Sequence, residues 1–302
     1  MNKVKKTAFL LLLLLFALPG LSFSAQVGVI LTGDIPYYQE MHRAFAQAIK
    51  QAGHVDIVLQ TPSPDPIAWS NAARKMEAIG VDVIVTYGAP ATLAAIREAS
   101  RTPVVFAGVS DYQALGIGGK KVTGISSKVQ PTGVIKNLKA IKDFSRLGII
   151  YSSVEKDTSI QAAEVERLEG QFGFKAVKID FRSAADAGKI RSVDAIYLTT
   201  SCSAQQCLSK IVGVARALRA PTATTVSGGE NVGVILTVSA DPEEQGAKAA
   251  ELAAKILKGT PPSALHIEVP RKIEIVLNLR EATAMGLKVP LDVLTSASRV
   301  VK

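Results

Sequence analysis

The sequence is poor in the side chains that most often hold metals or perform acid–base catalysis. Its 302 residues include three histidines and two cysteines. His42, His54 and His266 are far apart, and none has a second metal ligand at the spacing of a zinc site. The chain also lacks the Gly-x-Ser-x-Gly turn of serine hydrolases, and no histidine lies at the end of an expected strand. We therefore expect no metal, no cofactor, no catalytic residue and no enzymatic activity.

Basic residues outnumber acidic ones, but they form no long block that would bind nucleic acid. The chain has 35 Lys and Arg against 26 Asp and Glu, a formal net charge of +9. The notable basic pairs are Lys120-Lys121 and Arg271-Lys272, and a pair of this kind is typical of solvated surface. We expect no nucleic-acid partner.

Long hydrophobic runs are absent except near the N-terminus, where residues 8–18 are apolar. This run is short for a membrane span. Three lysines within residues 3–6 precede it, and Pro19-Gly20 and small residues follow it, which is the layout of a secretory signal peptide. We expect residues 1–24 to be removed by cleavage after Ser24 and the protein to be periplasmic; an uncleaved anchor is the alternative.

Both cysteines lie close together, at positions 202 and 207. An oxidising compartment permits a disulfide between them. Within one regular helix their Cα atoms would be too far apart, so a bridge requires Cys202 to lie in the loop before the helix. We favour the Cys202–Cys207 disulfide, with two buried thiols as the alternative.

Residues 81–111 contain two buried strands joined by a helix. Residues 81–85 and 103–109 are rich in β-branched and apolar side chains, as expected for parallel strands covered on both faces. Between them, Gly88-Ala89-Pro90 opens a helix, because proline is favoured in a first helical turn. Asp111 follows the second strand. Ligands bind at this edge of open α/β sheets.

The same pattern occurs a second time. Val193-Asp194-Ala195-Ile196 matches Val81-Asp82-Val83-Ile84, and residues 147–151 are similar to residues 27–31. We therefore expect an α/β fold of two Rossmann-like lobes with parallel sheets and a hinge between them. The expected division places residues 25–124 and 240–265 in lobe 1, and residues 125–239 and 266–302 in lobe 2.

Candidate ligand-binding residues of the first half follow the ends of its strands. The positive end of a helix that begins near Pro90 favours an anionic group. Other interpretations stay open: Thr86 as a turn cap, Asp34 as a helix N-cap, and the two tyrosines as ordinary surface residues. The candidates are Asp34, Tyr37, Tyr38, Thr86, Gly88, Ala89, Ala91, Thr92 and Asp111.

Candidates in the second half are mostly hydroxyl-bearing and occupy the equivalent strand ends. The alternative for Thr158 and Ser159, which we favour, is that one of them caps a helix beginning at Ile160. The candidates are Ser152, Thr158, Ser159, Thr199, Thr200, Ser201, Thr225, Ser227 and Glu230.

Four stretches of the chain resemble the ABC transporter substrate-binding protein family, which includes tryptophan- and tyrosine-binding members. They are VDVIVTYGAPATLAA (81–95), TPVVFAGVSD with VTGIS (102–111 and 122–126), GAKAAELAAKILKGTPPS (246–263) and VLNLREATAMGLKVPLDVLTSAS (276–298). The resemblance implies type I periplasmic-binding-protein architecture and an exported, monomeric protein. Such a protein captures a small polar or aromatic solute, an amino acid among the options, by hinge closure and delivers it to an ABC permease in the inner membrane. A periplasmic sensor that docks on a membrane signalling receptor is the alternative.

The resemblance also implies roles for particular residues. The loop at residues 88–92 would hold a ligand carboxylate, with Asp111 nearby, and lobe 2 would contribute residues 152–159, 199–203 and 225–227. Relatives commonly carry an acid in the loop after the repeated Val-Asp-Ala-Ile strand, whereas this chain has Thr-Thr-Ser at 199–201. An α-ammonium group would then need Glu230, Asp111 or Asp34 as its partner, and a ligand other than an amino acid stays open.

Overall fold

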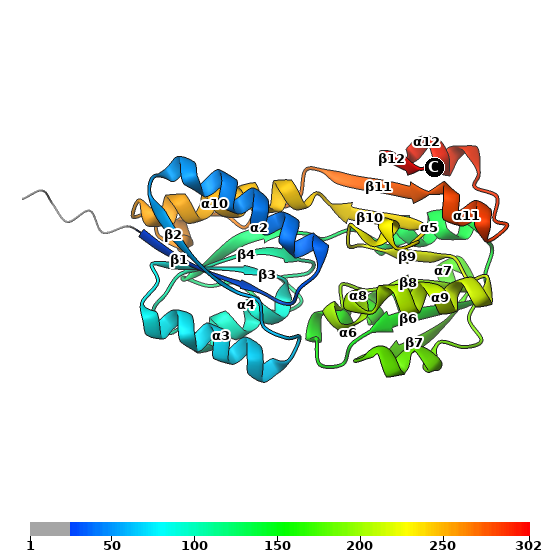
Figure 1. Cartoon of the computed structure of the whole chain (residues 1–302), viewed down its shortest axis with the longest axis horizontal. Helices are drawn as coiled ribbons and strands as arrows, with labels where there is room; N and C mark the ends of the chain where they lie inside the picture. The colour runs from blue at the N-terminus through cyan, green and yellow to red at the C-terminus, as the bar shows by residue number, and fades with distance from the viewer. Residues whose placement is uncertain (1–24) are drawn as a thin grey trace, which may run out of the picture.

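Two β-sheets, each flanked by helices, lie one after the other along the long axis of the molecule (Figure 1). The structure, a computed structural model, describes residues 25–302. The expected signal peptide, residues 1–24, lies outside the described residues. Figure 1 shows the first sheet and its helices on the left, and the second sheet on the right.

The first sheet has five parallel strands in the order β2-β1-β3-β4-β5. We call this sheet with its helices lobe 1. Its strands are β1 (Ala25–Leu31), β2 (Val55–Gln60), β3 (Val83–Tyr87), β4 (Val104–Val109) and β5 (Val122–Ser126). Its helices are α2 (Pro36–Ile49), η1 (Lys50–Ala52), α3 (Pro66–Ile79), α4 (Ala89–Glu98) and the later α10 (Pro242–Leu257), which packs against α2.

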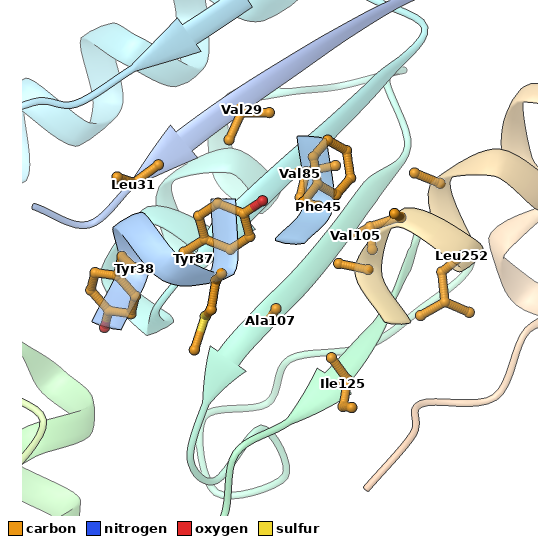
Figure 2. Close-up of a cluster of buried hydrophobic side chains, with 14 of the residues drawn as sticks. Val29, Leu31, Tyr38, Phe45, Val85, Tyr87, Val105, Ala107, Ile125 and Leu252 are labelled. Atoms are coloured by element: carbon orange, nitrogen blue, oxygen red, sulfur yellow. The ribbon is translucent and has the colours of Figure 1, made fainter. Parts of the chain in front are cut away.

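Both faces of this sheet are covered, which explains why its central strands are apolar throughout. Every residue of β3, β4 and β5 is buried. On one face, side chains of α2 and α10 such as Phe45 and Leu252 meet the strand residues Val29, Val85 and Val105 (Figure 2). On the other face, α3 and α4 bury a second cluster. Burial on both sides holds the carboxyl ends of β1, β3 and β4 at one edge.

The second sheet has seven strands in the order β12-β11-β10-β9-β8-β6-β7, and we call it with its helices lobe 2. β11 is antiparallel to β10. The strands are β6 (Arg146–Tyr151), β7 (Lys175–Asp180), β8 (Ala195–Leu198), β9 (Thr222–Thr224), β10 (Leu236–Ala240), β11 (Ile273–Asn278) and β12 (Arg299–Val301). Its helices are α5 (Pro131–Ile141), α6 (Lys156–Glu166), α7 (Glu169–Phe172), η2 (Ala184–Lys189), α8 (Cys202–Gln206), α9 (Leu208–Leu218), η3 (Gly229–Asn231), α11 (Leu279–Ala284) and α12 (Leu291–Ser296). The short helix η4 (Pro262–Ala264) lies near β5 of lobe 1.

Five strands of each sheet follow the same order, as the sequence repeat predicts. The order β7-β6-β8-β9-β10 in lobe 2 corresponds to β2-β1-β3-β4-β5 in lobe 1. The two repeated aspartates, Asp82 and Asp194, also make equivalent hydrogen bonds. Asp82 accepts a hydrogen bond from the backbone amide of Gln26 at 2.7 Å, and Asp194 accepts one from that of Arg146 at 2.8 Å. Each carboxylate therefore ties the start of a strand to its neighbour.

Three segments carry the chain between the lobes: residues 127–130, the junction at Ala240 and Asp241, and residues 258–272. Backbone hydrogen bonds join the last of them to β5, because Ser126 donates to the carbonyl of Glu268 and Glu268 donates to that of Gly124. β5 pairs with β4 as far as Ser126. The first crossing therefore begins after Ser126, two residues beyond the division expected from the sequence.

Candidate functional site

The carboxyl edges of the two sheets face each other, and the lobes touch there. The thiol of Cys202, in lobe 2, lies where a β-carbon on Gly33 of lobe 1 would be. The side-chain amide of Gln206 donates to the backbone carbonyl of Asp34 at 3.5 Å. Cys202 and Val226 are also buried in the same apolar cluster as residues of α2. The loops predicted to bind ligand are thus brought together across the lobe boundary.

Helix α4 begins at this boundary with its amino end toward lobe 2, where α4 contacts α6. Gly88, which precedes α4, has a φ of 91°, and a β-carbon there would collide with the Tyr38 and Thr32 hydroxyls. The amide of Ala91 donates to the Thr32 hydroxyl at 3.3 Å. This end of the helix therefore combines a positive dipole with the hydroxyl groups of Thr32 and Tyr38.

Thr86 and Thr92 are buried together behind this helix end. Their hydroxyl oxygens are 2.8 Å apart, and the Thr92 hydroxyl donates to the carbonyl of Gly88 at 2.7 Å. The Thr92 amide also donates to the carbonyl of Gly88, at 3.2 Å. The two threonines therefore fix the backbone around Gly88, and Ala89 is buried beside them at the first position of the helix.

The two predicted aromatic residues, Tyr37 and Tyr38, lie in the first turn of α2 and are both buried. Tyr37 is buried and donates its hydroxyl to the carbonyl of Ala240 at 3.3 Å, next to a crossing segment. Tyr38 is buried against Gly88, and burial together with the negative charges of lobe 2 raises its pKa. Asp34 is exposed and accepts from the Gln39 amide. Asp34 does not cap α2, because Ile35 holds the N-cap position.

Asp111 is paired with a lysine. Its carboxylate accepts from the Ala114 amide at 2.9 Å and from the Lys128 ammonium at 2.5 Å. Burial opposes ionisation, but these hydrogen bonds outweigh it and lower the pKa of Asp111. Lys128 also lies 3.7 Å from Glu164 of α6. Asp111 thus holds a turn and joins a charged cluster between the lobes.

Helix α6 of lobe 2 begins earlier than the sequence led us to expect. It starts at Lys156 with Glu155 at the N-cap, so neither Thr158 nor Ser159 is the cap that we favoured. The Thr158 hydroxyl lies inside the first turn and donates to the carbonyls of Ser152 and Glu155 at 2.8 and 2.9 Å. Ser159 is partly exposed on the next position, whereas the Ser152 hydroxyl is buried without a partner.

Glu155 is a buried acid whose oxygens are fully used within lobe 2. It accepts from the Ser201 hydroxyl and the Cys202 amide, both at 2.8 Å, and more weakly from the amide and hydroxyl of Ser203. Burial raises its pKa despite these bonds. The carboxylate caps the amino end of α8, whose N-cap residue is Ser201.

Asp157 is a second buried acid, two residues further on, and it keeps one oxygen free. Oδ2 accepts from the Thr200 hydroxyl at 3.0 Å, while Oδ1 is buried with no hydrogen-bond partner. Burial and the nearby Glu155 charge raise the pKa of Asp157 to about 7. The sequence argument named Ser152 and Thr158 in this loop and missed both carboxylates. The available signal was that both acids follow the end of strand 147–151 within a few residues.

The other predicted hydroxyl-bearing residues of lobe 2 follow the ends of β8 and β9. The Thr199 hydroxyl donates to the carbonyl of Ile150 at 2.8 Å, and Thr225 is half-buried beside Tyr197. Ser227 has a buried hydroxyl without a partner. It lines a cavity of about 110 Å³ that also includes Ile35 and Pro36 of lobe 1.

Glu230 is buried beside a cavity of about 410 Å³ that residues of both lobes line, but its carboxylate already has partners. It is only 3% exposed, accepts from the Gly228 amide at 2.9 Å and pairs with the guanidinium of Arg299 on β12. By accepting the hydrogen bond from the Gly228 amide, Glu230 also stabilises the turn after β9. Among the acids proposed from the sequence as ammonium partners, Glu230 and Asp111 therefore already have cationic partners, and Asp34 lies exposed.

Cys202 and Cys207 are free thiols, contrary to the disulfide that we favoured. Helix α8 begins at Cys202 itself, so this residue is not in the preceding loop, as a bridge would require. Cys202 is fully buried at the lobe boundary and burial raises its pKa, while Cys207 is only partly buried.

Within residues 25–302, no group of three or more His, Cys, Asp or Glu side chains is placed to hold a metal ion. The helices of this part of the chain are also too short or too polar to cross a membrane. What the site offers is a helix dipole, several hydroxyl groups and two buried carboxylates.

Comparison with known proteins identifies the family. The model of the ABC transporter substrate binding proteins matches residues 26–301. A tyrosine-binding protein of Clostridioides difficile is 20% identical over 282 residues, covering 87% of this chain and 81% of the relative. The match spans nearly the whole described chain, as the resemblance predicted.

Solved structures agree with the fold. An ABC domain from Streptococcus pneumoniae in complex with L-Trp is 20% identical and superposes with a TM-score of 0.86, covering 92% of this chain and 100% of that one. The ligand-free, open structure of a substrate binding protein from Clostridium difficile is 21% identical and covers 92% and 99%, with a TM-score of 0.66. The expected α/β fold of two lobes, as in type I periplasmic binding proteins, is confirmed.

Proposed function

Since this chain belongs to the ABC transporter substrate binding protein family, and is thus a solute-binding protein rather than an enzyme, we propose that it serves an ABC importer in the periplasm. In this proposal the protein works as a monomer. It captures a small solute between its lobes and delivers it to a permease in the inner membrane.

The proposed solute is an amino acid, and aromatic amino acids are the first to test. The observation that carries this choice is the opposite character of the two facing rims. Lobe 1 presents the amino end of α4 with the hydroxyl groups of Thr32 and Tyr38, which suits a carboxylate. Lobe 2 presents buried acids at the start of α6, which suit an ammonium group. The tyrosine-binding and L-Trp-bound relatives support the same ligand class.

Capture would proceed by hinge closure, and contacts between the rims support this. A ligand shifts a two-state equilibrium toward the closed form only if it binds that form better, which here means contacting both lobes. At nearly equal identity, this chain superposes better on the L-Trp-bound relative than on the open, ligand-free one. The described arrangement, with Cys202 against Gly33, has the character of a closed form.

The test is a thermal-shift screen of the purified protein with single amino acids, nucleosides and small organic acids, followed by titration calorimetry on the compounds that stabilise it. A ligand at about 100 times its Kd stabilises a native protein by about 2.7 kcal/mol, which is readily seen as a rise in Tm. Stabilisation by one or more amino acids, with a measurable Kd, is the expected result. If nucleosides or acids stabilise the protein and no amino acid does, the proposed ligand class is wrong.

A further inference from the structure

We propose that Asp157 accepts the ammonium group of the bound amino acid, and that it replaces an acid in the loop at residues 199–201. This inference rests on the proposed function, because it names the residue that selects for an amino group within that site. The argument depends on one free oxygen atom, on the charges around it and on its place between the lobes.

A chain of hydrogen bonds orients the Asp157 carboxylate. The Gln161 side-chain amide donates to the Thr200 hydroxyl at 2.7 Å, and the Gln161 carbonyl oxygen accepts from the Thr200 backbone amide at 3.0 Å. Because the Thr200 hydroxyl accepts from Gln161, its own proton is directed to Asp157 Oδ2, 3.0 Å away. The network holds Oδ2 and leaves Oδ1 as the atom available to a ligand.

The free oxygen is buried and has no hydrogen-bond partner of good geometry, although the nearby backbone amides of Asp157 and Thr158 favour the ionised carboxylate. Asp157 is 6% exposed, and Oδ1 has no hydrogen-bond partner. Burying a carboxylate without compensation is costly, so buried charges are normally paired. Within residues 25–302, neither Asp157 nor Glu155 has a salt bridge to an arginine, lysine or histidine. Two neighbouring buried acids therefore lie together without a cationic side chain, and a ligand ammonium group would supply the opposite charge.

The two acids have different tasks. Both carboxylate oxygens of Glu155 accept hydrogen bonds from Ser201, Cys202 and Ser203 at the start of α8. Asp157 has a single hydrogen bond from a side chain, that of Thr200. A ligand ammonium group, which carries several N–H donors, would thus find its acceptor in Asp157, with the charge of Glu155 adding to the attraction.

Asp157 also lies on the side of lobe 2 that meets the proposed carboxylate site. It is in the first turn of α6, and α6 contacts α4 of lobe 1. Ile160, one turn further along α6, packs against the lobe 1 cluster that contains Ala91. The charge of Asp157 also acts on Tyr38, which touches Gly88. An ammonium acceptor and a carboxylate site thus stand on opposite sides of the boundary between the lobes.

Thr200 lies in the loop at residues 199–201, where the resemblance to the family predicts an acidic residue. Because its hydroxyl touches Asp157, a carboxylate at either position 157 or position 200 would reach nearly the same point. This proximity makes an exchange of the two residues an informative experiment.

The experiment compares ligands that differ only in the amino group. Purified wild-type protein, Asp157→Asn, and the exchange variant Asp157→Asn/Thr200→Asp are titrated with L-tyrosine and L-tryptophan, and with 3-(4-hydroxyphenyl)propionate and indole-3-propionate. Asp143→Asn is the matched control, because its carboxylate is in lobe 2 but 90% exposed. Circular dichroism and Tm confirm that each variant is folded, and Thr200→Val serves as a second, milder variant that removes the orienting hydroxyl.

We expect Asp157→Asn to weaken binding of the amino acids by about 30-fold or more, as when one partner of a buried charge pair is removed. Affinity for the propionates should change by less than about threefold, and Asp143→Asn should resemble the wild type. Thr200→Val should weaken binding of the amino acids only. The exchange variant should recover at least about tenfold in amino-acid affinity over Asp157→Asn.

Other outcomes separate this inference from the proposed function. If the wild type binds the amino acids and Asp157→Asn binds them equally well, the assignment of Asp157 is overturned while the proposed function stands. An equal loss of affinity for the amino acids and the propionates also overturns it, because it indicates a general structural effect. If the wild type binds no amino acid at all, the proposed ligand class fails and this inference fails with it.

Discussion

The Cys202 thiol of lobe 2 fills the space that a β-carbon on Gly33 of lobe 1 would need. This contact joins the loop after β1 to the start of α8, so it depends on how closely the lobes approach each other. Glycine at position 33 is required here for close approach, since its φ is not in the left-handed region.

Gly33→Ala should therefore hinder closure and leave each lobe intact. A methyl group at position 33 would collide with Cys202 Sγ but would lie 3.6 Å from Cys202 Cβ, which is an ordinary contact. We expect Gly33→Ala to weaken ligand binding at least about tenfold, and the double variant Gly33→Ala/Cys202→Ala to recover most of the loss, by calorimetry. Failure of the second substitution to recover affinity would show that the contact does not limit closure.

Gly88→Ala should destabilise lobe 1. The residue has a φ of 91°, and a β-carbon would collide with the hydroxyl groups of Tyr38 and Thr32. We expect a loss of about 1–3 kcal/mol in the free energy of unfolding, measured with urea. Gly133→Ala is the matched control, because Gly133 lies in helix α5 with open space around it, and alanine there should be neutral or stabilising. Equal effects of the two substitutions would contradict the strain argument.

Asp157 should make the ligand-free protein less stable as the pH rises. Its pKa is raised from the ordinary 3.8 to about 7, so the neutral form is favoured in the folded state. The free energy of unfolding is then highest below the ordinary pKa and falls as the pH rises toward 7, by up to about 4 kcal/mol. Asp157→Asn removes this loss, so its stability relative to the wild type should increase between pH 5 and pH 8. A difference that stays constant over this range in urea denaturation would rule out the effect.

The same carboxylate should make amino-acid affinity depend on pH. A ligand ammonium group pairs with the ionised form, so below about pH 7 a proton must leave Asp157 before the pair forms. We expect the Kd of an amino acid to rise by up to about tenfold for each pH unit below 7 in the wild type. For Asp157→Asn the Kd should be nearly flat over the same range, and a steep profile in both proteins would assign the titration to another group.

Purified protein prepared without reductant should contain two free thiols. Cys202 is buried at the lobe boundary and Cys207 is only partly buried. We expect intact mass after alkylation in denaturant to show two labels per chain. In the native protein, a saturating ligand should slow the labelling of Cys202 more than that of Cys207. A mass corresponding to no labels would restore the disulfide.

Much of the fold could be predicted because its causes are local or repetitive. The apolar β-branched runs at β3 and β4 indicated strands covered on both faces, and Pro90 marked the start of α4. The repeat around Asp82 and Asp194 indicated two lobes with the same strand order. In the structure, each of these aspartates accepts a hydrogen bond from the backbone of a neighbouring strand.

The site was only partly predictable, because hydroxyl groups and acids at strand ends have several ordinary uses. Either Thr158 or Ser159 was expected to cap a helix beginning at Ile160, but the helix begins at Lys156 and its cap is Glu155. Asp111 and Glu230 were proposed as ammonium partners, and each has a cation of its own, Lys128 or Arg299. Those partners are distant in sequence, so no local pattern reveals them.

By itself, the sequence determined the class of fold, its two-lobed repetition and the edge where binding residues gather, since hydrophobic period and strand direction depend on neighbouring residues. Only the tertiary structure decided which acid has a free oxygen and which thiol lies at the lobe boundary. Asp157 keeps a buried oxygen without a partner because Thr200 and Gln161 come from separate segments to hold the other oxygen. Burial and pairing of charges are properties of the packed chain, and they distinguish this carboxylate from the others.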